Sequence, residues 1–73
     1  MTPRVRSYAW EAANRNGVSV HAIFSRTRTV PVVAARNEVM RRLRWQDGFT
    51  TSQIGRWMGR DHSTVIHATR GLI

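Results

Sequence analysis

Three residues near the C-terminus, Gly55, Gly59 and Val65, have the spacing of a helix-turn-helix, and this spacing constrains the fold strongly. Gly55 would lie on a helix face where the missing side chain lets the next helix approach closely. Gly59 would take the positive φ of the tight turn. Val65 would pack into the angle between the two helices. The spacing therefore predicts two short helices joined by a sharp turn.

The first of these helices has a clear start signal. The stretch from Thr50 to Gln53 is typical of a capping box, in which the N-cap threonine and the glutamine three residues later satisfy backbone N–H groups. Phe49 and Ile54 are placed for the matching hydrophobic staple. We therefore predict a helix of about two turns from Thr51 to Met58.

The second helix begins with polar side chains. Asp61 can cap its N-terminus, because the carboxylate accepts from free N–H groups and meets the positive end of the helix dipole. Short hydrogen-bonding residues fill the next positions: His62, Ser63 and Thr64. An apolar face recurs at helical spacing over Val65, Ala68, Thr69 and Leu72. A helix with a polar tip and one buried side is suited to reading base edges in a DNA major groove.

Charge is the strongest global signal. The chain of 73 residues has a net charge of +8, and all 12 of its basic residues are arginine. Half of them lie between Arg26 and Arg44, where Glu38 is the only acid. Arginine has a planar fork that suits bidentate contacts with phosphate and guanine. These features predict a polyanion as the partner.

Length and composition limit the alternatives. A chain this short predicts one domain, residues 1–73, with a small core. It has no cysteine, and His21, His62 and His67 share no helical face, so we expect no metal site. No apolar run reaches the roughly 20 residues of a membrane span. The N-terminal arginines are not followed by the apolar segment of a signal peptide, so we expect none. We therefore expect a cytoplasmic, nucleoid-associated protein that does not contact membranes.

Three further helices are expected before the helix-turn-helix. The predicted ranges are about Arg4 to Arg15, ending at Asn16-Gly17; Val20 to about Ser25, capped by Ser19; and Pro31 to about Gln46. The whole chain is then an all-α domain of about five helices. Trp45 and Trp57 are expected in the core or at a seam. Trp10 lies off the apolar face of its helix, and His67 is expected to be a buried structural residue.

The segment from Arg26 to Val30 interrupts the helical pattern and is predicted to be an exposed loop. It is basic and precedes a proline. Two interpretations stay open. It is either a solvated charged turn, or an arginine arm that enters a minor groove or holds phosphates.

The stretch from Gly59 to Ala68 resembles the C-terminal DNA-binding domain of the bacterial chromosomal replication initiator DnaA. That family carries the signature Gly-Arg-Asp-His-[Ser/Thr]-Thr-Val-[Leu/Ile]-His-Ala, and this chain matches it at every position. A weaker resemblance covers most of the remaining chain. It implies a helix-turn-helix domain of the DnaA type, similar to that of the Trp repressor, with double-stranded DNA as the partner.

The resemblance also implies roles for particular residues. Those expected to read bases are Asp61, His62, Ser63 and Thr64 in the major groove and Arg28 in the minor groove. Those expected to hold the DNA backbone are Arg26, Arg36, Arg44, Thr51, Ser52 and Arg60.

Three differences from the family pattern fall near this surface. One glycine precedes the signature arginine instead of two, Val33 to Arg36 keeps only the last residue of the family's Ala-Arg-Pro-Arg, and Ser52 replaces a proline. We therefore do not transfer the family's usual DNA box to this chain. The sequence also contains no glycine-rich phosphate-binding loop.

The expected function is sequence-specific binding of duplex DNA in transcription, with RNA polymerase or another regulatory protein as a further partner. One alternative is binding at a replication origin, as an initiator fragment or a competing paralogue. Another is a non-specific nucleoid or RNA-binding protein. Asp61 and His62 are adjacent and point apart, so they form no acid–base pair. We expect no enzyme activity, cofactor or small-molecule ligand.

Overall fold

The computed structural model describes residues 2–70, and this range forms five helices without a strand. They are α1 (Pro3–Asn16), α2 (Val20–Ile23), α3 (Val30–Trp45), α4 (Thr51–Met58) and α5 (His62–Thr69). The predicted all-α architecture is confirmed. The predicted position of Leu72 on the last helix lies outside the described residues.

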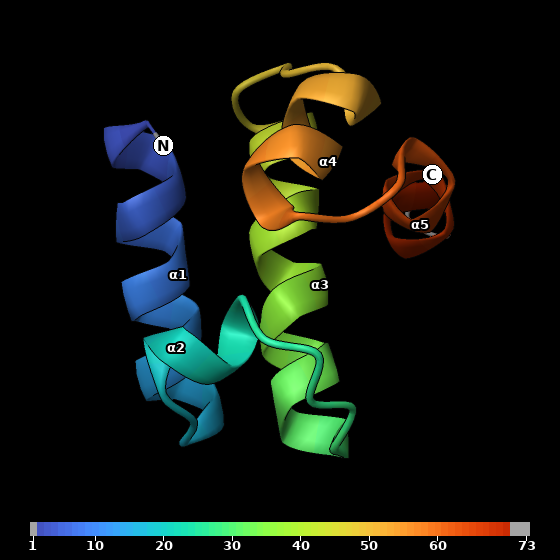
Figure 1. The fold of residues 1–73 in the computed structure, drawn as a ribbon. Coiled ribbons are helices and arrows are strands. Elements are labelled where there is room, and N and C mark those ends of the chain that lie inside the picture. Colours follow the sequence, from blue (N-terminus) through green and yellow to red (C-terminus); the bar gives the residue numbers. More distant parts are fainter. Residues whose placement is uncertain (1, 71–73) are drawn as a thin grey trace.

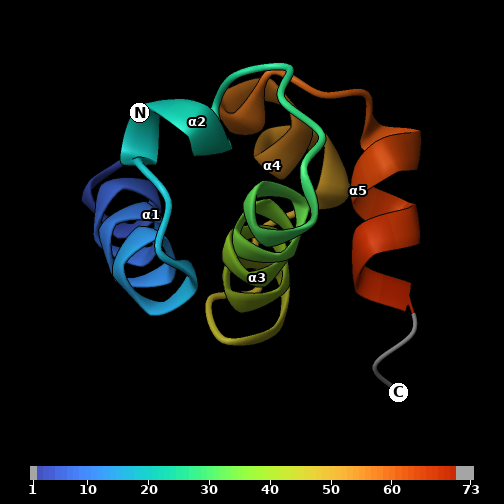
Figure 2. The same ribbon diagram turned by 90° about the horizontal axis from the view of Figure 1, so that it is seen from below.

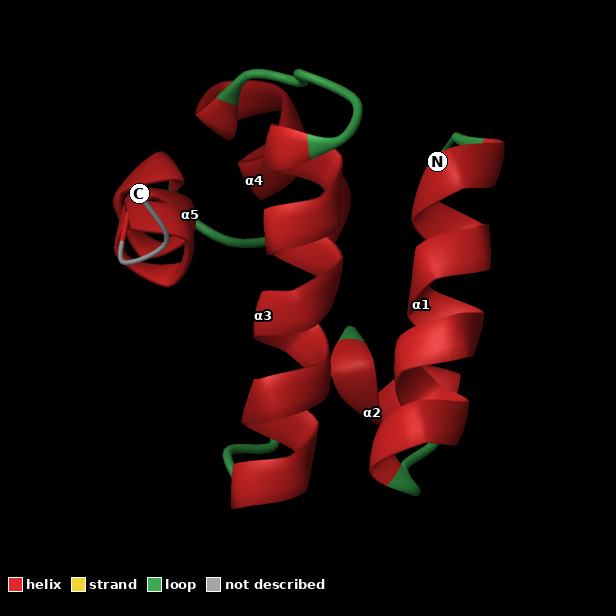
Figure 3. Cartoon of the chain, turned by 180° about the vertical axis from the view of Figure 1, so that it is seen from behind, coloured by secondary structure: helices red, strands yellow, loops and turns green. Residues whose placement is uncertain are grey.

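Helix α3 is the centre of the molecule, and each of the other four helices packs against it. Helix α1 runs beside α3 in the opposite direction, with the short α2 across one end of the pair (Figure 1). Seen from below, α1 and α5 lie on opposite sides of α3 (Figure 2). The view from behind shows α4 at the end of α3 that is farther from α2 (Figure 3). Helix α3 thus separates α5 from α1.

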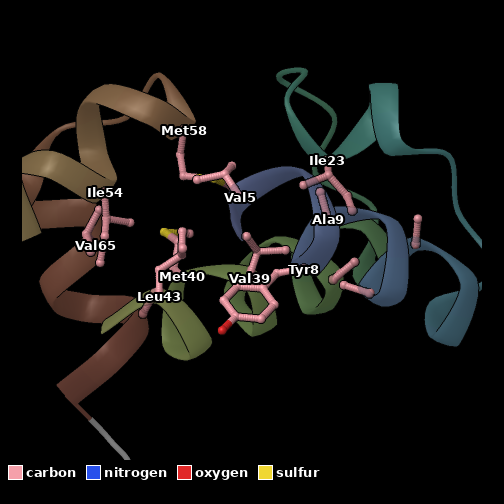
Figure 4. Close-up of a cluster of buried hydrophobic side chains, with 14 residues drawn as sticks. Val5, Tyr8, Ala9, Ile23, Val39, Met40, Leu43, Ile54, Met58 and Val65 are labelled. Carbon is pink, nitrogen blue, oxygen red and sulfur yellow. The ribbon is translucent and has the colours of Figure 1, made fainter. Parts of the chain in front are cut away.

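The core forms where the apolar stripes of these helices meet over α3 (Figure 4). Removing each large aliphatic side chain from water contributes about 1.5–3 kcal/mol, and this burial offsets the chain entropy lost on folding. The fully buried larger side chains come from all five helices: Val5, Ile23, Val39, Met40, Leu43, Ile54, Met58 and Val65.

The turn between α4 and α5 agrees with the prediction in detail. Thr50 and Gln53 form the complete capping box at the start of α4. Gly59 ends the helix with a φ of 68°, and its N–H donates to the carbonyl of Gly55. Val65 is fully buried between the helices. The helix-turn-helix of the sequence analysis is therefore confirmed.

Several helix ends differ from their predicted positions by one or two residues, and those on either side of the basic loop affect its extent. Helix α2 ends at Ile23 and not near Ser25, because the Ser25 hydroxyl bonds back to the carbonyl of Ala22 at 2.7 Å and turns the chain. Helix α3 begins at Val30, one residue early, with Pro31 in its first turn. The basic loop therefore covers residues 24–29, instead of the predicted range from Arg26 to Val30.

Trp45 and His67 are more exposed than predicted. Trp45 keeps 47% of its surface exposed, because α3 ends there and none of the helices in residues 2–70 covers it fully. His67 is exposed on the outer side of α5, so it is not a buried structural residue. Trp57 does pack against the core, edge-on to Phe49 with ring centroids 4.8 Å apart. Trp10 is 65% exposed.

Candidate nucleic-acid interface

The first turn of α5 presents a row of exposed polar side chains. All four candidate base-reading residues of this helix are exposed: Asp61, His62, Ser63 and Thr64. The backbone N–H groups of Thr64 and Val65 donate to the carbonyl of Asp61 at 3.0 and 3.3 Å. The buried side of the helix is supplied by Val65 and Ala68, so the polar tip carries no packing role.

Asp61 occupies the N-cap position, but its side chain makes no capping hydrogen bond. The prediction that its carboxylate caps α5 is therefore wrong. Its backbone is extended, with φ −65° and ψ 151°, and only its carbonyl begins the helix. The carboxylate is exposed at the helix tip, where it can accept hydrogen bonds from a ligand.

The residues between α2 and α3 form the predicted exposed loop. Both loop arginines, Arg26 and Arg28, are exposed. A small network of the Ser25 hydroxyl with the N–H and hydroxyl of Thr27, at 3.1 and 2.9 Å, shapes the first turn of the loop. Figure 2 shows this loop on the same edge of the molecule as the turn between α4 and α5.

Arg36 does not lie where a phosphate-binding residue was expected. Its side chain is 5% exposed, and its guanidinium donates to four backbone carbonyls of α2 and the loop. Burial lowers the pKa of Arg36, and the nearby charges of Arg60 and Arg28 lower this pKa further. The prediction that Arg36 is an exposed contact to the DNA backbone is therefore corrected, because its guanidinium is buried and bound to carbonyls of the protein.

Arg60 approaches the same loop from the other side. It follows the turn glycine and directly precedes Asp61 in the chain. Its guanidinium donates to the carbonyl of Ser25 and, at 3.3 Å each, to the carbonyls of Met58 and Gly59. The loop and the helix-turn-helix are therefore in direct contact through one side chain.

A groove of about 870 Å³ separates the loop from the tip of α5. Its polar lining comes from the loop, α3, α4 and the turn before α5: Arg26, Arg28, Arg36, Asn37, Arg56, Arg60, Asp61 and Thr64. The fold thus brings six of the candidate residues together on one concave surface. His62 and Ser63 are exposed beside it and do not line it.

The positive charge of the groove is largely uncompensated. Three ion pairs, with N···O distances of 2.8, 3.1 and 3.2 Å, hold the other described acids near α1: Arg42–Glu11, Arg15–Glu38 and Arg4–Asp47. Asp61 is then the one carboxylate among the five arginines that line the groove. A concave surface lined by charges of one sign concentrates potential and attracts an anionic ligand.

The remaining candidates, Arg44, Thr51 and Ser52, do not line the groove. Arg44 and Thr51 line a second hollow, together with Trp45, Ile66, Thr69 and Arg70. The Arg44 guanidinium donates to the carbonyl of Phe49 at 3.3 Å but stays exposed, and Ser52 is exposed in the first turn of α4. This hollow borders α5 at Ile66, Thr69 and the C-cap residue Arg70, and not at the tip of the helix.

Two residues of this surface were not predicted from the sequence. Arg56 is exposed at the groove, and a count of helical positions from Gly55 would have placed it beside the turn. Ile66 is an apolar side chain, 40% exposed, on the helix that carries the polar tip. Its exposure depends on how α5 is rotated against α3, which the helical period alone does not define.

The fold and the site together define a helix-turn-helix DNA-binding domain. A family model described as the bacterial DnaA protein helix-turn-helix matches residues 11–71, and the chain belongs to this family. The predicted family relationship is confirmed. DNA binding is accordingly what the domain does, and the family is not a class of enzymes. Neither a curated protein nor a solved structure matches the chain.

Within residues 2–70, no helix combines the length and the apolar character that a membrane crossing requires.

Proposed function

We propose that this domain binds duplex DNA sequence-specifically and acts in transcription. The tip of α5 enters the major groove, where Asp61, His62, Ser63 and Thr64 meet base edges. The loop lies over the adjacent minor groove, where Arg28 meets the concentrated negative potential of an AT-rich segment.

One observation carries the proposal. A single concave surface holds both the loop arginines and the start of α5, and its arginines outnumber its acids five to one. The two expected reading elements are therefore close enough for one DNA duplex to contact both. A scattered basic coat, as in a non-specific nucleoid protein, would not combine a charged groove with an exposed polar helix tip.

The backbone contacts in this proposal differ from the initial set by one residue. Arg26, Arg44, Thr51, Ser52 and Arg60 are retained, since each is exposed or partly exposed. Arg56 replaces Arg36, because it is exposed at the groove whereas Arg36 is buried. Phosphate contacts of this kind position the protein on the duplex and make its affinity depend on salt.

The transcription role rests on what these residues can do by themselves. Residues 1–73 contain no phosphate-binding glycine loop, so their activity is docking on DNA. Docking alone is sufficient to block or to recruit RNA polymerase. The family relationship favours a second candidate, binding at a replication origin in competition with the initiator.

Selection of bound sequences from a random duplex pool tests both candidates. Enrichment of one motif supports sequence-specific binding. A motif that differs from the initiator's box supports the transcription role, and a motif that matches the box supports the origin role. Recovery of a pool without any enriched motif would contradict specific recognition.

A further inference from the structure

The basic loop has little internal structure to hold its shape. The preceding helix α2 has four residues, and a helix of this length is not stable by itself in water. The N–H groups of Phe24 and Ser25 close its last turn on the carbonyls of His21 and Ala22, and no helical turn follows to extend this pattern. The loop residues from Arg26 to Thr29 are exposed, so apolar packing does not fix them. Another part of the molecule must therefore order this segment.

The side chain of Arg36 binds four backbone carbonyls of α2 and the loop. From the first half of α3 it donates to the carbonyls of Ile23 (2.8 Å) and Ala22 (3.2 Å), which end α2. It also donates to the carbonyls of Ser25 (2.9 Å) and Thr27 (3.0 Å), which begin the loop. A planar guanidinium with donors on several nitrogens can span such a set, whereas the point charge of an ammonium cannot.

Arg60 adds a second tie from the helix-turn-helix. Arg60 and Arg36 both donate to the carbonyl of Ser25, although Arg60 is 35 residues from Ser25 in the sequence. Because Arg60 directly precedes the N-cap of α5, this contact joins the loop to the start of the recognition helix. Two arginines on opposite sides of the loop therefore hydrogen-bond to the same turn of its backbone, at Ser25.

We infer that Arg36 and Arg60 are positioning residues, which hold the loop in one shape and set where Arg28 stands relative to the tip of α5. The inference rests on the proposed function and deepens it. The minor-groove arm and the major-groove helix are one preorganised unit before DNA arrives. Because the loop is already ordered, binding does not lose the entropy of ordering it.

For Arg36 this role replaces the expected phosphate contact, whereas for Arg60 it adds to the phosphate contact proposed above. A phosphate contact acts only when DNA is bound. The hydrogen bonds from Arg36 and Arg60 to the loop, here called the clasp, act already in the free protein. Arg56 provides the matched control, since it lines the same groove and makes no hydrogen bond to the loop among the described contacts. Arg36→Lys and Arg60→Ala are the test variants. Arg36→Lys removes the guanidinium but keeps an aliphatic chain in the buried position, and Arg60→Ala removes only the contact from the second arginine.

The first measurement is the NMR order parameter of the backbone amides at residues 26–29 in the free 73-residue chain. We expect values near about 0.85 in the natural protein and in Arg56→Ala, and below about 0.6 in Arg36→Lys and Arg60→Ala. Amides of α4 and α5 report that the variants remain folded. Loop values that stay at the natural level in both test variants would overturn the inference.

The second measurement is a double-mutant cycle on the preferred duplex. Arg36→Lys should weaken binding at least about tenfold in the natural background but less than about twofold when Arg28 is already alanine, because the two act through the same arm. An undiminished loss in the Arg28→Ala background would show a direct DNA contact instead, and would also overturn the inference. Absence of DNA binding by the natural protein would refute the proposed function while leaving the loop measurement decisive for the clasp.

Discussion

A Cβ atom added at Gly55 would lie 2.6 Å from the backbone carbonyl oxygen of Arg60. The same two residues are joined by a hydrogen bond of 2.8 Å from the N–H of Arg60 to the carbonyl of Gly55. Helix α4 and the turn before α5 are therefore in direct backbone contact. No side-chain rotation can relieve a clash there, because the backbone fixes the position of a Cβ atom and its neighbour is a main-chain oxygen.

Gly55→Ala should therefore destabilise the domain. Overpacking costs about 1–3 kcal/mol, and the better helix propensity of alanine returns at most about 1 kcal/mol. Because the colliding atom is backbone, we expect a net loss and a displaced α5, measured as a lower thermal midpoint and weaker DNA binding. Ser52→Ala, on the exposed side of the same helix, is the control for stability. Equal melting curves for the two variants would contradict the close approach.

Thr50→Ala and Asp61→Ala compare two N-cap positions with different hydrogen bonding. The Thr50 hydroxyl accepts from the N–H of Gln53 at 3.1 Å, so its loss should cost about 1 kcal/mol of unfolding free energy. Asp61 makes no such bond, and only its charge near the helix dipole remains, so its loss should cost about 0.5 kcal/mol or less. Denaturant unfolding measures both values. A larger loss from Asp61→Ala would mean that its carboxylate does cap α5 in solution.

Features that depend on residues close in the sequence were predictable. The capping box at Thr50, the glycine turn at Gly59 and the buried Val65 all follow from short-range geometry. Features that depend on how helices pack were not. Arg36 was expected at the DNA backbone because the family resemblance implied that role. Its burial follows from the carbonyls that α2 and the loop place around it.

The tip of α5 shows the same limit within a single helix. Its polar sequence predicted exposure, and the residues are exposed. The hydrogen bonding of Asp61 was not predictable, because a side-chain cap depends on a rotamer and not on residue type alone. The exposure of Trp45 and His67 likewise depends on which faces of α3 and α5 remain uncovered.

His62→Ala should weaken binding to the preferred duplex by about 1–3 kcal/mol, which is roughly ten- to hundredfold. The imidazole stands first in α5 and is exposed, and the core does not use it, so stability should change by less than about 0.5 kcal/mol. His67→Ala, further along the same helix, is the matched control and should weaken binding less. An equal loss on preferred and scrambled duplexes would remove the base-reading role of His62.

Arg28→Ala and Arg44→Ala should affect binding in different ways. Arg28 is on the loop, and its loss should matter most on sites with an AT-rich flank, where the minor groove is narrow. Arg44 is exposed beside α4, and its loss should weaken all sequences about equally and reduce the salt slope by about 1. Titrations over a range of salt on AT-rich and GC-rich flanks distinguish these results. Loss of the same size on both flanks for Arg28→Ala would exclude its minor-groove role.

Chemical-shift mapping of the isotope-labelled domain on its selected duplex tests the central claim most directly. The account predicts the largest amide shifts at residues 26–29 and 61–64, which border the arginine-lined groove, and small shifts along the exposed side of α1. Scrambled duplex should give weaker shifts at residues 61–64, since only phosphate contacts remain. Shifts that centre on α1 and α2, or that are identical for both duplexes, would contradict recognition by the loop and the tip of α5.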